Sequence, residues 1–242
     1  MAAVPMHDKT TVRMNQKTTV PADQKTTVRL NQKTAVPAQQ KTALGFAPGT
    51  ERRQATLLCI ELRGLARLSE ALDPGLVIVL ANEFFNFAAD AVAAHGGEAV
   101  DAQHELLLSL FTRGNPSQTS QQAVRAAQRV QSGFPAIAEK WRVAYGLRAA
   151  VAQGLHLGEA VLGVAGPRGL ERRTALGDSV ALALCMVHRA RAGEFVMSDS
   201  VMGALSVENL DLDAEPLPQL ELPRRTPIRI YGVLVEGRLD FT

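Results

Sequence analysis

The residues with the clearest chemical potential are acids, histidines and arginines near the ends of predicted strands. Glu61 ends a buried run, and His104 and Glu105 share a turn between two further runs. One histidine with one carboxylate is too small a ligand set to predict a metal centre. Arg172 and Arg173 could meet a phosphate, although charge pairs in loops are usually solvated. The sequence holds neither a G-x-S-x-G elbow nor a P-loop, so the enzyme chemistries that use them have no support.

A second set of candidate residues lies in an eight-residue repeat near the N-terminus. Lysines recur every eight residues from Lys9 to Lys41, and a threonine follows each of them. These threonines are Thr10, Thr18, Thr26, Thr34 and Thr42. Each unit has one regular aliphatic residue and alternate units contain proline, which predicts a disordered tail over residues 1–50 rather than a solenoid.

Phosphate on these threonines would create repeated dianions that Arg-lined pockets can bind, and five copies would raise avidity. The K-T-x-V units resemble ligands of forkhead-associated domains, which implies a phosphothreonine reader and a Ser/Thr kinase as partners. The alternative is a polar linker that expanded by duplication. Both interpretations stay open on the sequence alone.

Charge divides the 242 residues into two parts. Residues 1–50 hold seven basic and two acidic residues, a formal +5, whereas residues 51–242 hold 19 basic and 22 acidic residues, a formal −3. A charge of +5 over fifty residues without interleaved aromatics does not favour nucleic-acid binding. The acidic part is long enough for one sizeable core and predicts a single domain over 51–242.

The sequence predicts neither a membrane-spanning segment nor an export signal, so we expect no membrane as a partner. No uninterrupted apolar run reaches the ~18 residues that a bilayer requires, and the N-terminus has no apolar signal core. The two cysteines, Cys59 and Cys185, lack metal-ligand spacing and lie among apolar residues, which predicts buried free thiols. A cytoplasmic location follows as the expectation.

The elements that must position the candidate residues follow from periodicity and from glycine and proline breaks. We predict the order β-α-α-β-β-α-β-β-α-β, followed by a short helix and a closing strand. The predicted strands are 55–62, 98–103, 106–112, 143–154, 160–165, 194–197 and 226–236, with a turn at Gly158-Glu159 between the fourth and fifth. The predicted helices are 64–72, 74–94, 117–132 (interrupted at Gly133 and Pro135), 178–191 and 198–205. This order predicts an α+β fold, a ferredoxin-like α/β sandwich with an extra hairpin.

Five segments in this order resemble motifs of the catalytic domain of class III adenylate and guanylate cyclases. Residues 59–65 resemble F-x-D-I-x-G-F, and 95–100 resemble h-G-G-x-v-v. Residues 101–111 take the place of K-x-x-G-D-x-x-x-A-x-F, 158–166 are close to G-e-v-v-x-G-x-x-G, and 172–180 are close to r-y-t-x-x-G-D-x-V. The resemblance covers about Thr56 to Leu205 and implies a cyclase-type fold and head-to-tail pairing of two domains.

The resemblance also assigns roles to individual positions. Glu61 and Glu105 occupy the two metal-binding aspartate positions, so Mg²⁺ or Mn²⁺ is implied if the protein is active. Asp101 stands where the family has its base-selecting lysine, and Thr174 stands at the second base-contacting position. Asp178 belongs to the adjoining Gly-Asp-Ser turn, where we expect it to cap the helix that begins at Ser179.

Two further positions lack the catalytic groups of the family. Ala181 stands at the asparagine position and Cys185 at the arginine position, which implies loss of the groups that orient the ribose and stabilise the transition state. Losing one such group costs on the order of 10²–10³ in rate. We therefore predict a degenerate, inactive domain with no cofactor, which serves in signalling as a homodimer or heterodimer. The alternatives are an active adenylate cyclase, completed by a partner chain, and a non-catalytic nucleotide sensor.

Overall fold

The computed structural model of the chain describes residues 50–206 and 212–234. The predicted repeat tail, including its five threonines, lies outside the described residues except for Thr50. The strands are β1 (Glu51–Arg63), β2 (Glu98–Gln103), β3 (Leu106–Phe111), β4 (Ala150–Ala165), β5 (Arg172–Leu176), β6 (Glu194–Ser198), β7 (Glu215–Leu220) and β8 (Ile228–Leu234). The helices are α1 (Leu65–Ala71), α2 (Pro74–Ala94), α3 (Pro116–Tyr145), α4 (Asp178–Arg189) and α5 (Asp199–Ser206).

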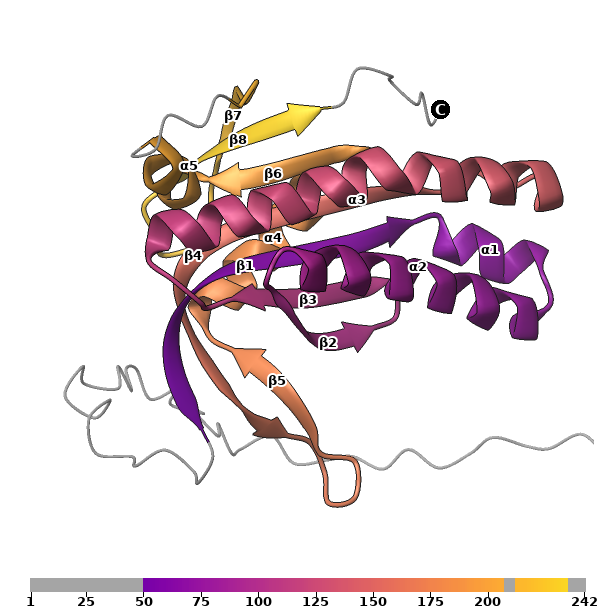
Figure 1. Ribbon diagram of the computed structural model, residues 1–242, viewed down its shortest axis with the longest axis horizontal. Helices are drawn as coiled ribbons and strands as arrows, with labels where there is room; N and C mark the ends of the chain where they lie inside the picture. Colours follow the sequence, from indigo (N-terminus) through magenta and orange to yellow (C-terminus); the bar gives the residue numbers. More distant parts are fainter. Residues whose placement is uncertain (1–49, 207–211, 235–242) are drawn as a thin grey trace, which may run out of the picture. The chain divides into compact units, whose positions relative to one another are not determined.

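The strands form one mixed sheet in the order β2-β3-β1-β4-β6-β8-β7, and β5 pairs with the far end of β4 (Figure 1). β1 lies in the centre because it pairs antiparallel with both β3 and β4. The pairing of β4 with β6 is parallel, and helix α4 lies between these strands in the chain. These features match the predicted α+β class.

The alternation of β1 explains how helices come to cover both faces of the sheet. Leu58 and Ile60 point into a core shared with α2, α3 and α5, whereas Leu57 and Cys59 point into a second core under α4. Successive strand residues face opposite sides, so one apolar strand serves both cores. Burial raises the pKa of the Cys59 thiol, which stays protonated and acts as an apolar side chain.

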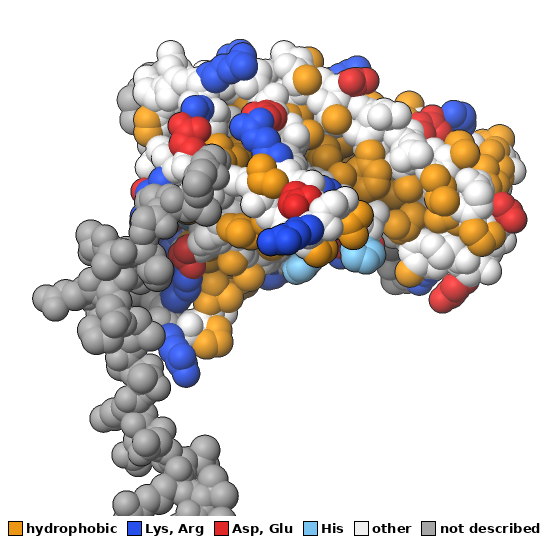
Figure 2. Space-filling view, turned by 90° about the horizontal axis from the view of Figure 1, so that it is seen from below, with side chains coloured by type: hydrophobic (Ala, Val, Ile, Leu, Met, Phe, Trp, Pro, Cys, Tyr) orange, Lys and Arg blue, Asp and Glu red, His pale blue; other side chains and the backbone are white. Residues whose placement is uncertain are grey.

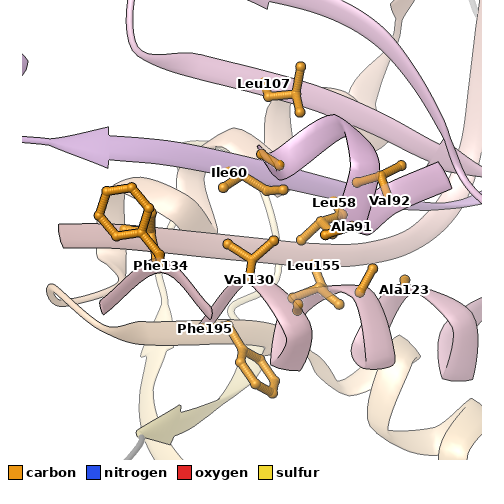
Figure 3. Packing of buried hydrophobic residues seen from close by; sticks show 14 of the residues in the cluster. Leu58, Ile60, Ala91, Val92, Leu107, Ala123, Val130, Phe134, Leu155 and Phe195 are labelled. Atoms are coloured by element: carbon orange, nitrogen blue, oxygen red, sulfur yellow. The ribbon is translucent and has the colours of Figure 1, made fainter. Parts of the chain in front are cut away.

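The larger core is closed by aromatic packing between α2 and α3. Phe134 meets Phe84 and Trp141 edge-to-face, with ring centroids 6.0 and 5.8 Å apart. Figure 3 shows Phe134 and Val130 of α3 near Ile60 and Leu107 of the sheet. The Trp141 indole donates to Oε2 of Glu83 at 3.0 Å, which satisfies the one polar atom of this buried ring.

One predicted helix start follows from local chemistry, and one predicted break is wrong. Asp73 caps α2 by accepting a hydrogen bond from Gly75 N at 2.8 Å, with Pro74 at the first helical position, as predicted. α3 does not break at Gly133 and Pro135 but runs unbroken to Tyr145. Buried side chains on both sides of the proline, Phe134 and Trp141 among them, hold the helix together and offset the lost hydrogen bond.

The predicted hairpin turn at Gly158-Glu159 is also wrong. These residues pair with Ala55 and Gln54 of β1, so β4 continues through them for 16 residues in all. The turn instead falls at 166–171, and β5 returns along the end of β4. The turn was therefore predicted too early. The strand predicted from residue 143 overlaps the end of α3, and strands β5 and β7 were not predicted. We call the part of this hairpin from Val161 to Leu176 the arm.

Among the described residues, one helix, α2, has the length and the apolar composition that would allow it to cross a membrane. In this structure it packs on α3 and on β2 and β3 at the edge of the sheet, and it buries Leu80, Phe84 and Val92. Its first turns leave Ile78 and Val79 about 60% exposed, at 62% and 60%. Hydrophobic side chains gather at this end of the molecule in Figure 2.

Candidate functional site

A cleft of about 1040 Å³ opens between four elements: the end of β1, the β2–β3 hairpin, the arm and α4. Its polar lining residues are Glu61, Asp101, Gln103, His104, Glu105, Glu171, Arg172, Thr174 and His188. Figure 2, which views the molecule from below, shows acidic, basic and histidine side chains close together on this side. Four of the residues singled out by the cyclase resemblance, Glu61, Asp101, Glu105 and Thr174, therefore share one cavity.

Glu61 lies at the floor of the cleft because β1 places it on the face that α4 covers. Its side chain is only 9% exposed, and its Oε1 forms an ion pair with the Arg63 guanidinium at 2.8 Å. Arg63 is held in turn by the carbonyl oxygens of Val187 and Ala190, at 2.9 and 3.4 Å, where α4 ends. An acid at a strand end is more often solvated or paired with a lysine, whereas Glu61 is buried and paired with an arginine.

The second oxygen of Glu61 has no hydrogen-bond partner among the described residues, although it is buried. The His188 imidazole faces this oxygen, with its Nε2 at 4.0 Å. Burial raises the pKa of Glu61, Arg63 and His188 oppose that shift, and the neighbouring Glu105 adds to it. Burial therefore disfavours the ionised form of Glu61, and one of its oxygens is free to accept a hydrogen bond.

Glu105 reaches the cleft through the tight turn between β2 and β3. His104 adopts a positive φ of 53° there, and the Glu105 carbonyl accepts from Leu62 N at 2.8 Å, which ties the turn to the end of β1. The turn was predicted at these residues. It brings the Glu105 side chain to the same cavity as Glu61.

Asp101 and Thr174 form a polar contact of their own across the cleft. Thr174 Oγ1 donates to Asp101 Oδ2 at 3.0 Å, and Gln103 Nε2 donates to the same oxygen at 2.9 Å. These are the two positions that the resemblance assigns to base recognition. In this structure the two side chains hydrogen-bond to each other, and this bond joins β2 to β5 of the arm.

The α4 positions that matter in the family lie beside the cleft rather than in it. Val180, Leu184 and His188 line the cavity at intervals of four residues, whereas Ala181 and Cys185 are not among its lining residues. Ala181 is exposed and Cys185 is a half-buried free thiol, not the fully buried one we predicted. A methyl and a neutral thiol supply no charge to a reacting phosphate.

Asp178 does not cap α4, contrary to the prediction. The N-cap is Gly177, whose φ of 130° disfavours other residues, and no side-chain oxygen caps the helix. Asp178 lies in the first turn, where it can still favour the helix dipole, and pairs with Arg225. Arg225 lies in the loop before β8, so sequence distance concealed this partner.

Sequence reasoning missed Arg63 and His188 as neighbours of Glu61. A strand spacing of two between Glu61 and Arg63 was a usable signal, because such residues share one face. The spacing of four from Leu184 to His188 was another, since it defines one helical stripe. Arg172 does reach the cleft, whereas Arg173 turns to Glu98 on β2.

The residues present do not fit the two-metal site that the resemblance implies. Mg²⁺ demands near-ideal octahedral geometry, whereas here the longer glutamate stands at both aspartate positions and one oxygen of Glu61 is already paired with Arg63. Within residues 50–206 and 212–234, no group of three or more His, Cys, Asp or Glu side chains is placed to hold a metal ion.

The sheet order, the helices on both faces and the arm define the fold of the class III nucleotide cyclase domain. Among solved structures, the chain is similar to the adenylyl cyclase CyaB from P. aeruginosa, with a TM-score of 0.70 and 20% identity over 80% of this chain and 99% of that one. It is also similar to the guanylyl cyclase Cya2, with a TM-score of 0.66 and 22% identity over 78% of this chain and 96% of that one.

A third similar structure is the non-canonical dimeric guanylyl cyclase domain of the RhoGC fusion protein from the aquatic fungus Blastocladiella emersonii. Its TM-score is 0.62 at 16% identity, and the match covers 76% of this chain and 98% of that one. In sequence, the chain is 24% identical over 133 residues to adenylate cyclase 1 of Rhizobium meliloti (strain 1021). That match spans 54% of this chain and 20% of the relative. A scan against models of protein families finds no match. The resemblance to cyclase domains is thus confirmed for the fold.

Proposed function

We propose that this domain is a cyclase-like module that pairs with another such domain and does not convert nucleotides. The observation that carries the proposal is the absence of the groups that, in the family, select the base, orient the ribose and stabilise the transition state. Ala181 and Cys185 replace the asparagine and arginine of the family, and Asp101 replaces the lysine and is bound to Thr174. Removing several such groups leaves too little transition-state stabilisation for turnover.

The test of inactivity is direct. The purified chain is incubated with ATP or GTP and Mn²⁺, and cyclic AMP and cyclic GMP are measured by mass spectrometry. We expect no more product than from the matched Glu61→Ala, Glu105→Ala double variant. Product clearly above that control would refute the proposal and establish an active cyclase.

The pairing part of the proposal is supported by the apolar side chains of the arm. Val164, Leu170 and Leu176 are 65%, 71% and 58% exposed, which is unusual for large aliphatic residues gathered on one hairpin. A solved structure of the same fold is described as a non-canonical dimer, which supports pairing in general but not the particular surface. The proposed partner is a second copy or another cyclase-like domain.

Sedimentation velocity tests this pairing. Leu170→Glu introduces a charge on the arm, and Val143→Glu introduces the same charge on the end of α3, where Val143 is 72% exposed. We expect a concentration-dependent dimer for the parent and for Val143→Glu, and a monomer for Leu170→Glu. A monomeric parent would exclude the homodimer and leave the heterodimer, to be sought by co-expression with cyclase-like domains of the same organism. Dimers of all three proteins would show that the arm is not the interface.

A partner that supplies the missing groups is a second candidate, favoured by one observation. Glu61 keeps a buried carboxylate with an unpaired oxygen in the cleft. An unpaired buried acceptor costs folding free energy, which favours a role in binding over a purely structural one. In that case the mixture of the two chains, but neither alone, would produce cyclic nucleotide. Loss of that product with Glu61→Gln in this chain would assign it the acidic half of the site.

For the repeat tail we propose recruitment of a phosphothreonine-reading domain after phosphorylation by a Ser/Thr kinase. The support is the regular Lys-Thr spacing in the sequence. Treatment with kinase should allow capture on an immobilised forkhead-associated domain, and replacing all five repeat threonines by alanine should abolish it. Equal capture of both proteins would refute the proposal. The cytoplasmic location stays a prediction.

A further inference from the structure

The charge balance of the cleft is opposite to that of a nucleotide site. Its lining contains four carboxylates, Glu61, Asp101, Glu105 and Glu171, and one guanidinium, that of Arg172, a formal charge of −3 with the histidines neutral. Counting Arg63, which pairs with Glu61 but is not among the lining residues, still leaves −2. A nucleoside triphosphate would bring further negative charge into this cavity and be repelled.

The unpartnered oxygen of Glu61 shows what the cleft lacks. Its carboxylate is nine-tenths buried, and its Oε1 is already bound to Arg63. Its Oε2 has no donor, and His188 at 4.0 Å is too far for a hydrogen bond. A buried acceptor of this kind is costly to leave unpaired, so a ligand that carries an N–H donor and a positive charge would be favoured here.

The remaining walls of the cleft are apolar. Leu106 and Leu108 come from β3, Leu176 ends β5, and Val180 and Leu184 come from α4. The cavity thus combines a carboxylate at its floor with hydrophobic sides, the usual arrangement of small-molecule sites in which a few polar groups orient an apolar ligand. Its volume suits a small organic molecule.

We propose that this cleft binds a small organic cation, with its amine, amidine or guanidine group on Glu61 and its apolar body against β3 and α4. The proposal goes beyond the absence of turnover, because it assigns the cavity a ligand class of opposite charge. It also does not require the dimer. The cleft would report the presence of such a cation to whatever domain pairs with the arm, since the arm forms one of its walls.

Three probes of equal size and different charge test the proposal on the full chain: benzamidine, benzamide and benzoate. Binding is followed by calorimetry and by nuclear magnetic resonance shifts of the isotope-labelled protein. We expect benzamidine to bind at least tenfold more tightly than benzamide, and benzoate to give no saturable binding. Equal affinities for the cation and the anion would overturn the proposal, as would tighter binding of ATP than of benzamidine in the absence of metal.

Matched variants locate the site. Glu61→Gln keeps the shape of the side chain and should weaken benzamidine at least tenfold, whereas Glu70→Gln removes an exposed acid of α1 outside the cleft and should change nothing. Glu105→Gln serves as a second cleft variant if Glu61→Gln fails to fold, and we expect it to weaken binding at least threefold. Unchanged affinity in the folded cleft variant refutes the assignment. The cyclase assay is separate from these measurements, so the proposed inactivity and the cation site can fail independently.

Discussion

His156 provides a sharp test of how the core responds to acid. The residue lies on β4, and its Nδ1 is 3.0 Å from the Ser198 hydroxyl. Burial is the main cause that lowers the pKa of His156, from 6.5 to about 4, while Asp199 opposes the shift and Arg225 adds to it. The folded protein therefore keeps this imidazole neutral at a pH where the unfolded chain would already protonate it.

The sign and size of the effect follow from linkage. Between pH 6.5 and about pH 4 the unfolded state binds more protons, so stability falls as the pH falls through this window. At about 1.4 kcal/mol per pKa unit, the full loss in the free energy of unfolding is about 3 kcal/mol, of which about 2 kcal/mol is already present at pH 5. At pH 7.5 the penalty is close to zero.

Urea unfolding from pH 7.5 to pH 5 measures this term when the parent is compared with His156→Gln. Glutamine can still hydrogen-bond to Ser198 but cannot titrate, so titrations shared by both proteins cancel in the difference. We expect the parent to lose about 2 kcal/mol relative to the variant by pH 5. His104→Asn, which changes an exposed turn histidine, should show no such change. If the difference in unfolding free energy between the parent and His156→Gln stays constant within about 0.5 kcal/mol from pH 7.5 to pH 5, the reasoning is refuted.

Three further outcomes are expected. Gly154→Ala should lower the free energy of unfolding by about 1–3 kcal/mol in urea, because a Cβ there would overlap the α4 backbone, whereas Gly203→Ala meets no atom within 4 Å and should cost nothing. For Glu61→Gln the raised pKa means that ionisation opposes folding, so the parent should gain stability relative to the variant as the pH falls from 7 towards 5, and an opposite slope would contradict the burial argument. Glu83→Gln should cost roughly 1 kcal/mol at pH 7 by fluorescence-detected unfolding, because it weakens the contacts of Glu83 with Lys140 and Trp141, and the cost should shrink below pH 4.5.

The parts of the fold that the sequence predicted are those set by local periodicity. α2 and its Asp73 cap, the β2–β3 hairpin and the central part of β1 all carry their signals within one segment. The errors arose where tertiary contacts override a local break. Pro135 lies inside α3, and Gly158 sits in a continuous strand because its backbone pairs with β1 and a Cβ would meet Ser179.

The candidate site was predicted to the same extent, and for the same reason. Motif order placed Glu61, Asp101, Glu105 and Thr174 in one family site, and the structure gathers these four residues in one cleft. The contacts that decide their chemistry were not predictable. The bond between Asp101 and Thr174 joins residues that are 73 positions apart, and the partners of Arg63 lie more than 120 positions away on α4.

Strand β4 connects the core of the sheet to the arm without a break. Residues 153–155 of this 16-residue strand lie between β1 and β6, and its C-terminal part extends outward to carry the arm. No joint separates these two parts, because β1 pairs with β4 from Arg63↔Ala150 to Glu51↔Leu162. Because Glu61 pairs with Ala152 in this same ladder, we expect a displacement of the arm to be transmitted to the strand that carries the floor of the cleft.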